Sequence, residues 1–138
     1  MLKAAQAETH AATLLITHDL GLVAELCDRV IVMYAGKSVE EGLVDDVLER
    51  PQHPYTRALL RSLPSYTMEH EGSTDAPPRL AEIPGIVPII TPQSIGCTFA
   101  PRCNEAGPRC TAENPPLIAI DSTQSTRCWA RQPEGAEA

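Results

Sequence analysis

The clearest structural signal in this chain is the stretch RVIVMYAGKSVEEG, residues 29–42. Residues 29–34 form a mostly apolar run that is typical of a strand. Gly36 comes next, and glycine tolerates the positive φ angle that a tight hairpin turn requires. Residues 38–42 suit a short returning strand. The stretch therefore predicts two strands joined by a turn over residues 35–37.

A second apolar run precedes the hairpin. Residues 13–17 (TLLIT) are apolar without interruption, which predicts a strand buried on both faces, as in a parallel sheet. Asp19 is suited to cap a helix after this strand. Apolar residues then recur at helical spacing, at positions 20, 23, 24 and 27. We therefore expect a strand and then a helix with one apolar face, in which Cys27 is a core residue.

Regular structure is predicted as far as residue 64. We expect a brief helix over residues 45–50 and another within residues 51–64, with Pro54 in its first turn. His53 is assigned to a turn without chemistry. Residues 1–8 have the composition of a helix end, and residues 65–76 that of a polar linker. The segment after this linker shows neither helical nor strand periodicity, and we expect it to bury little apolar surface.

Composition divides the chain into two unlike parts. None of its 13 prolines precedes Pro51, and four of its five cysteines lie after residue 96. Its 11 basic and 18 acidic residues give a formal net charge of −7, which argues against a nucleic-acid-binding surface. It has neither an apolar run of the roughly 20 residues that cross a bilayer nor a start resembling a signal peptide. We therefore expect neither a secreted nor a membrane-spanning protein.

The late cysteines suggest a binding site. Their spacing is Cys97-x5-Cys103-x6-Cys110-x17-Cys128. Disulfides are disfavoured without a secretion signal. Four thiolates suit Zn²⁺, although zinc sites usually contain closely spaced cysteine pairs. Four cysteines also suit a [4Fe–4S] cluster, whose separated iron corners accept looser spacing. The spacing leaves zinc and cluster open, beside the simpler reading of four small apolar residues.

Arginines directly precede three of these cysteines, at positions 102, 109 and 127. A neighbouring positive charge favours the thiolate that a metal or cluster needs. We therefore expect these arginines to lower the pKa values of the thiols, unless they are ordinary solvated side chains.

His18 is a candidate ligand-binding residue. It follows a predicted strand and precedes a predicted helix, the position at which open α/β sheets bind ligands. Its ring is able to hydrogen-bond a phosphate oxygen or a water, or simply the local backbone, and the pattern leaves both open. The sequence contains no Gly-rich phosphate loop.

Several stretches resemble a known family. Residues 14–20 (LLITHDL) resemble the H-loop region of ABC-type ATPases, and residues 28–42 resemble the sequence that follows it. Residues 51–60 (PQHPYTRALL) are similar to the narrower group of oligopeptide/dipeptide importer ATPase subunits. The C-terminal extension of that group resembles residues 83–88, 96–103, 115–117 and 127–128, together with Cys110.

The resemblance implies an α/β fold in two parts. Residues 1–63 would be the C-terminal part of a P-loop (ABC-type) ATPase domain, from the H-loop onward. Residues 64–138 would be a linker and an irregular Cys/Pro-rich extension with a four-Cys site. The Walker A phosphate loop, signature motif and Walker B acidic pair lie upstream of the H-loop in the family and are absent from this sequence. At the position of Ser38 the family usually has an apolar or a longer residue. We expect this difference to have little effect.

The resemblance also assigns roles to residues. His18 would be the switch histidine, which contacts the γ-phosphate and helps to place the attacking water. Cys97, Cys103, Cys110 and Cys128 would hold a [4Fe–4S] cluster, with zinc as the alternative, in a structural or a redox role. ATP and Mg²⁺ would bind only in the intact subunit.

The function implied is part of an ATP-binding subunit that powers import of short peptides across the bacterial cytoplasmic membrane. The intact subunit would pair with a second ATPase subunit and dock on membrane-spanning permeases, peripheral on the cytoplasmic face of the inner membrane. We expect the chain, as a truncated product or fragment, to hydrolyse no ATP alone and residues 1–63 to aggregate or lose order in isolation. The alternative is a stand-alone Fe–S or zinc-binding interaction module.

Overall fold

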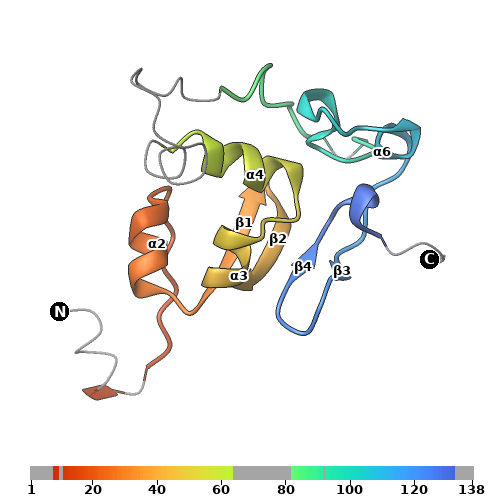
Figure 1. The fold of residues 1–138 in the computed structure, drawn as a ribbon. Coiled ribbons are helices and arrows are strands. Elements are labelled where there is room, and N and C mark those ends of the chain that lie inside the picture. The colour runs from red at the N-terminus through yellow and green to blue at the C-terminus, as the bar shows by residue number, and fades with distance from the viewer. Residues whose placement is uncertain (1–7, 10, 64–81, 92, 133–138) are drawn as a thin grey trace, which may run out of the picture.

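A four-stranded antiparallel sheet organises the chain (Figure 1). The computed structural model describes residues 8–9, 11–63, 82–91 and 93–132. The strands are β1 (Arg29–Tyr34), β2 (Lys37–Leu43), β3 (Ile118–Ala119) and β4 (Ser125–Thr126), in the spatial order β1-β2-β4-β3. Most of the helix end predicted over residues 1–8, and all of the linker predicted over residues 65–76, lie outside the described residues.

The predicted hairpin is confirmed. β1 and β2 pair antiparallel and are joined through Ala35 and Gly36, whose φ angles are 47° and 76°. Two central residues with positive φ form a turn whose twist matches that of the flanking strands. Val32 and Tyr34 of β1 are buried, whereas the alternate residues Ile31 and Met33 are each 59% exposed. One face of the hairpin is therefore packed, and the other is open.

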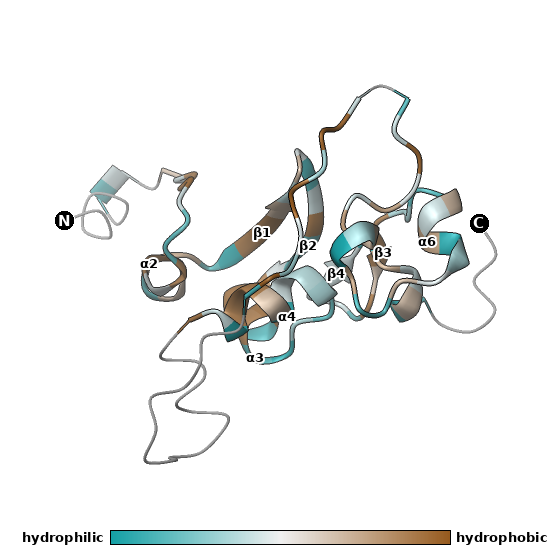
Figure 2. Cartoon of the chain, turned by 90° about the horizontal axis from the view of Figure 1, so that it is seen from above, coloured by the Kyte–Doolittle hydropathy of each residue, from teal (hydrophilic) through white to brown (hydrophobic). Residues whose placement is uncertain are grey.

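Three helices confirm the predictions around the hairpin. The helix α2 (Leu20–Leu26) is capped by Asp19, whose Oδ1 accepts a hydrogen bond from the Leu22 amide at 3.1 Å. The helices α3 (Val44–Glu49) and α4 (Pro54–Arg61) follow β2, and Pro54 is in the first turn of α4. Both views place α3 and α4 on one side of the hairpin (Figures 1 and 2).

The strand predicted over residues 13–17 is wrong for this structure. The segment forms no strand, and Leu14 and Ile16 are 86% and 89% exposed. A strand is stable only when neighbouring strands satisfy its backbone N–H and C=O groups. No described segment of this chain pairs with these residues, so the Leu14 and Ile16 side chains are exposed.

The C-terminal extension is more regular than its composition predicts. Besides β3 and β4 it forms η1 (Ala100–Arg102), α6 (Pro108–Ala112) and η2 (Trp129–Arg131). β4 pairs with β2 through Glu40↔Thr126 and Glu41↔Ser125. The fully buried Thr126 hydroxyl also donates to the Val39 carbonyl at 3.1 Å. The extension thus completes the sheet that the first half begins.

An aromatic cluster forms much of the core. Phe99, the only phenylalanine of the chain, is 2% exposed. Its ring lies edge-on to Tyr34, with centroids 5.2 Å apart, and 5.4 Å from the ring of Tyr55. Such contacts add about 0.5–1.5 kcal/mol per pair beyond the burial of apolar area. The segment that we expected to have little core therefore contributes a central core residue.

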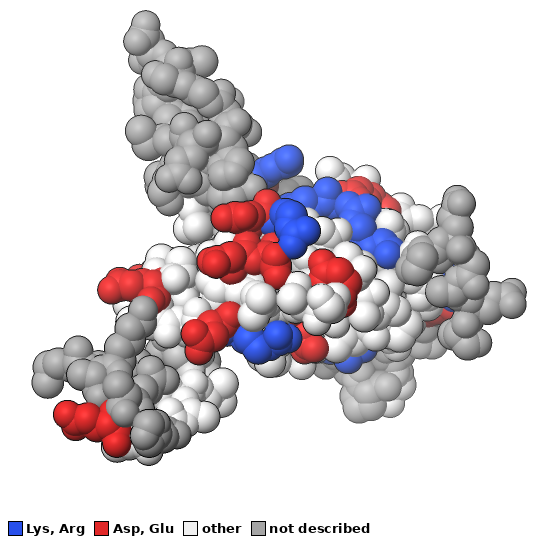
Figure 3. Space-filling view, turned by 60° about the horizontal axis from the view of Figure 1, so that its bottom comes forward, with Lys and Arg blue, Asp and Glu red and all other residues white. Residues whose placement is uncertain are grey.

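The surface carries both signs of charge. On the face drawn in Figure 3, Asp and Glu side chains lie among Lys and Arg side chains, and no continuous basic surface is seen there. Among the described residues, no helix has both the length and the apolar character needed to span a bilayer.

Candidate functional site

The four late cysteines meet around one small cavity. Cys97, Cys103, Cys110 and Cys128 all line it, and its volume of about 10 Å³ is near that needed for a single water molecule. Cys27, which was predicted to be a core residue, is half-buried and does not line this cavity. The structure thus brings together four residues that span 32 positions of the sequence.

Short elements bring these thiols together. Cys103 follows η1, Cys110 belongs to α6 and Cys128 precedes η2. The Cys97 amide donates to the Cys110 carbonyl at 2.7 Å. Gly96 allows this approach, because its φ is +87° and a Cβ atom at this position would lie 2.7 Å from the same carbonyl oxygen.

The cavity does not form a site for one metal ion. No group of three or more His, Cys, Asp or Glu side chains within the described ranges is placed to hold a single ion. The four thiols are nevertheless the donor set that zinc and iron–sulfur clusters use. The residue types fit such a group, although the thiols as placed in the structure do not form a ligand set for one ion.

The expected lowering of the thiol pKa by the preceding arginine is wrong for Cys103 and Cys128. Burial, the largest cause, raises the pKa values of the Cys97, Cys103 and Cys128 thiols above their usual range. Arg102 instead donates to the Pro84 and Ile83 carbonyls, each at 2.7 Å, and Arg109 stacks on Trp129 with its guanidinium carbon 3.6 Å from the ring centroid. Two of the three arginines therefore hold other parts of the extension.

Sequence reasoning missed two buried polar residues, His53, which lines the cavity, and Glu40, which accepts from the His53 amide. His53 is 1% exposed and lines the same cavity as the cysteines. Its Nδ1 accepts from the Tyr55 amide at 3.0 Å, which caps α4, and burial lowers the pKa of its ring to about 4. Pro54 at the first helical position was the available signal, because it makes residue 53 the N-cap.

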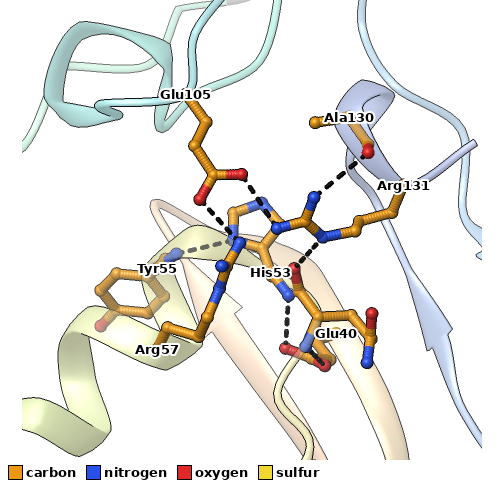
Figure 4. Close-up of polar contacts among 8 residues, drawn as sticks. Glu40, His53, Tyr55, Arg57, Glu105, Ala130 and Arg131 are labelled. Carbon is orange, nitrogen blue, oxygen red and sulfur yellow. Dashed lines mark hydrogen bonds and ion pairs between the residues drawn. The ribbon is translucent and has the colours of Figure 1, made fainter.

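The Glu40 carboxylate joins three segments (Figure 4). It is fully buried on β2 and accepts from the amides of Gln52, at 2.6 Å, and His53, at 3.0 Å. It also accepts from the Gln124 side chain at 2.8 Å. Nothing in the local sequence indicates this burial, because the partners are up to 84 positions away.

A partly exposed ion cluster lies over the same region (Figure 4). The Glu105 carboxylate pairs with Arg57 of α4 at 2.7 Å and with Arg131 of η2 at 2.9 Å. Arg131 also donates to the Gln52 carbonyl at 3.1 Å. These contacts fasten the loop after Cys103 to α4 and to the segment after Cys128.

His18 lies apart from the cysteines. It is exposed, and it directly precedes the N-cap of α2. α2 and α6 lie on opposite sides of the β1–β2 hairpin in both ribbon views (Figures 1 and 2). The two sets of predicted site residues therefore form two separate regions of the molecule.

Comparison with known proteins gives consistent matches. The family model for the oligopeptide/dipeptide transporter C-terminal region matches residues 39–110, just over half of the chain. A probable peptide ABC transporter ATP-binding protein, y4tR of Sinorhizobium fredii, is 47% identical over 118 residues, 86% of this chain and 33% of that protein.

Two further relatives have transport names. The oligopeptide transport ATP-binding protein AppD of Bacillus subtilis is 45% identical over 130 residues, 93% of this chain and 37% of that protein. The dipeptide transport ATP-binding protein DppD of Escherichia coli is 43% identical over 123 residues, 89% of this chain and 36% of that protein. The chain spans about a third of the length of the curated relatives that it matches.

Proposed function

The chain belongs to the oligopeptide/dipeptide transporter C-terminal region family, and we propose that it is part of an ATP-binding subunit that powers the import of short peptides across the bacterial cytoplasmic membrane. The observation that carries this proposal is the match over residues 39–110. The subunit works with a second ATPase subunit and with membrane-spanning permeases, on the cytoplasmic face of the membrane.

Uptake of a labelled dipeptide or oligopeptide tests this function. Cells that lack the gene for the whole subunit should lose ATP-dependent uptake, and the wild-type gene should restore it. Unchanged uptake of every short peptide tested in the deleted strain would reject the proposal.

The domain division that goes with this function places residues 1–63 in the ATPase domain, from the H-loop onward, and residues 64–138 in the importer-specific extension. The hairpin and its covering helices support the first assignment, and the match as far as residue 110 supports the second. β2 and β4 pair across this division, so the extension is packed against the ATPase part rather than tethered beside it.

The proposed role of His18 is to contact the γ-phosphate of ATP and to position the attacking water. Its exposure and its place before α2 support access by a ligand. In the whole subunit, His18→Ala should lower uptake by about 10²-fold or more, the loss typical for a group that stabilises a transition state. The control Glu41→Gln, on β2, should leave uptake unchanged; equal uptake by the two variants would reject the role.

We expect no ATP hydrolysis by the chain alone. Phosphoryl transfer needs a phosphate cradle and metal ligands as well as a water-positioning group, and this sequence contains only the last. A phosphate-release assay should give the same background for the wild-type chain and for His18→Ala. Turnover by the wild-type chain above that of the variant would contradict this expectation.

The four-Cys cavity is proposed to hold a [4Fe–4S] cluster, with a single zinc ion as the alternative. Support comes from the four thiols that line one cavity, since four cysteines are the usual ligand set of such a cluster. When bound, the group would cross-link the four thiolates and so hold together the elements after residue 96.

Cysteine variants test whether these thiols hold the group. Cys103→Ser should remove most of the bound metal, whereas Cys27→Ser, outside the cavity, should retain it. Metal analysis of the purified variants gives the comparison, and equal loss in both would show that the cavity is not the site.

A further inference from the structure

A second, larger pocket shares Cys97 with the thiol cavity. Its volume is about 430 Å³, within the range of small-molecule sites. The start of β2 supplies Lys37 and Ser38, and the loop after Gly96 supplies Thr98. Asn114 and Arg127, from the segments around β3 and β4, complete the polar lining.

Long-range contacts build this pocket. The Arg127 amide donates to the Val39 carbonyl at 2.8 Å, which sets the segment after β4 beside β2. The Lys37 ammonium donates to the Asn114 side-chain oxygen at 3.0 Å. These contacts bring Lys37 and Arg127, which are far apart in the sequence, to the lining of the same pocket.

The pocket offers more donors than the chain uses. Within the described residues, the Ser38 and Thr98 hydroxyls make no hydrogen bond, and the Arg127 guanidinium makes only a long one, 3.5 Å, to the Pro115 carbonyl. Lys37 uses one of its three N–H donors on Asn114. Uncommitted donors in a concave site are suited to acceptor groups of a ligand.

The charge of the pocket is one-sided. Its lining includes Lys37 and Arg127 and no Asp or Glu, although the whole chain has a net charge of −7. Guanidinium and ammonium groups bind carboxylates and phosphates through charge-assisted hydrogen bonds. From this arrangement we propose that the pocket binds a small anion with a carboxylate or a phosphate group, a property independent of the transport function proposed above.

Ser38 gives the pocket part of its volume. Ser38 lines the pocket, and we expect a longer side chain at this position of β2 to occupy part of its space. Ser38→Ile therefore fills the pocket without changing its charge, whereas Lys37→Met removes a charge at similar length. The two variants test volume and charge separately.

Calorimetric titration of the full chain with inorganic phosphate and with succinate tests the proposal and separates the two anion classes. At least one anion should bind saturably, more weakly as ionic strength rises. Lys37→Met and Ser38→Ile should each weaken binding at least about tenfold, and the control Arg29→Gln, whose side chain does not line the pocket, should not. Failure of both anions to bind, or equal binding by all variants, overturns the proposal.

Amide chemical shifts give a second readout on the unaltered chain. The bound anion should shift the amide signals of Gly36 and Gly96, which line the pocket, and leave that of Gly107 unchanged. Shifts spread evenly over the chain would mean non-specific ion binding and would overturn the proposal even if a variant failed to fold.

Discussion

Single residues join the two halves of this chain. Glu40 lies on β2, in the first half, and accepts hydrogen bonds from the loop before α4 and from Gln124 in the extension. His53 caps α4, and its ring lines the same cavity as Cys128 of the extension. The buried Glu40 carboxylate and the His53 Nδ1 are tolerated because each has a hydrogen-bond partner. The cohesion of the molecule therefore depends on residues that local sequence patterns do not mark.

The Glu40 carboxylate should be important for stability. Glu40→Gln replaces one acceptor oxygen with a donor that faces N–H groups, which should lower the free energy of unfolding by about 1–3 kcal/mol. Urea unfolding monitored by circular dichroism measures the change. Glu41→Gln, which changes a half-buried neighbour on the same strand, should stay within about 0.5 kcal/mol. An equal effect of both substitutions would contradict the special role of Glu40.

Burial of His53 should make stability depend on pH. Its folded-state pKa of about 4 lies below its ordinary value of 6.5, so the unfolded chain binds the proton more readily between these values. The contribution of His53 to stability is thus complete above pH 6.5 and is lost as pH falls toward 4, by up to about 3 kcal/mol.

Urea midpoints at pH 7 and pH 5 measure this effect. The wild-type chain should lose more stability between the two pH values than His53→Gln does, because the variant lacks the titrating ring. The carboxylates titrate in both proteins and cancel in the comparison. Equal losses would mean that His53 is accessible to protons in the folded state.

Among the elements, those specified by neighbouring residues were predictable. The turn glycine, the Asp19 cap and Pro54 at a helix start are local signals, and the hairpin, α2 and α4 formed where they indicated. The run at residues 13–17 was misleading because a strand depends on partners. β4 was missed for the same reason, since its two residues become a strand only by pairing with β2.

The turn between β1 and β2 can be tested with a matched pair of glycines. Gly36 has a φ of +76°, and an added Cβ there would meet no atom within 4 Å, so Gly36→Ala changes only backbone strain. We expect it to lower the free energy of unfolding by about 1 kcal/mol. Gly107→Ala, in equally open space at a φ of −111°, should have little effect in the same urea experiment. Similar values for both would contradict the turn geometry.

At the scale of the whole molecule, the sequence indicated the four cysteines as a candidate site but did not predict the cavity that they line. Their shared cavity depends on Gly96, η1, α6 and η2 meeting, which is a tertiary property. The arginine prediction failed because adjacency in sequence does not bring a charge to the neighbouring thiol. Phe99 was overlooked because a proline-rich segment was not expected to contribute to the core.

The interdependence of the two halves predicts the result of truncation. A protein that ends at residue 63 lacks Phe99, Gln124 and Thr126, all buried against the first half, and leaves β2 without β4. It should aggregate or unfold without a cooperative transition, as measured by thermal melting with near-ultraviolet circular dichroism. A sharp melt like that of the full chain would show that residues 1–63 form an independent domain.

The central proposal is that this member of a peptide-importer family holds an iron–sulfur cluster at the four cysteines after residue 96. The most direct measurement is the iron, sulfide and zinc content of the anaerobically purified chain, together with its absorption near 400 nm. The account predicts a coloured protein with about four iron and four sulfide per chain. A colourless protein with one equivalent of zinc, or with no metal, would contradict it.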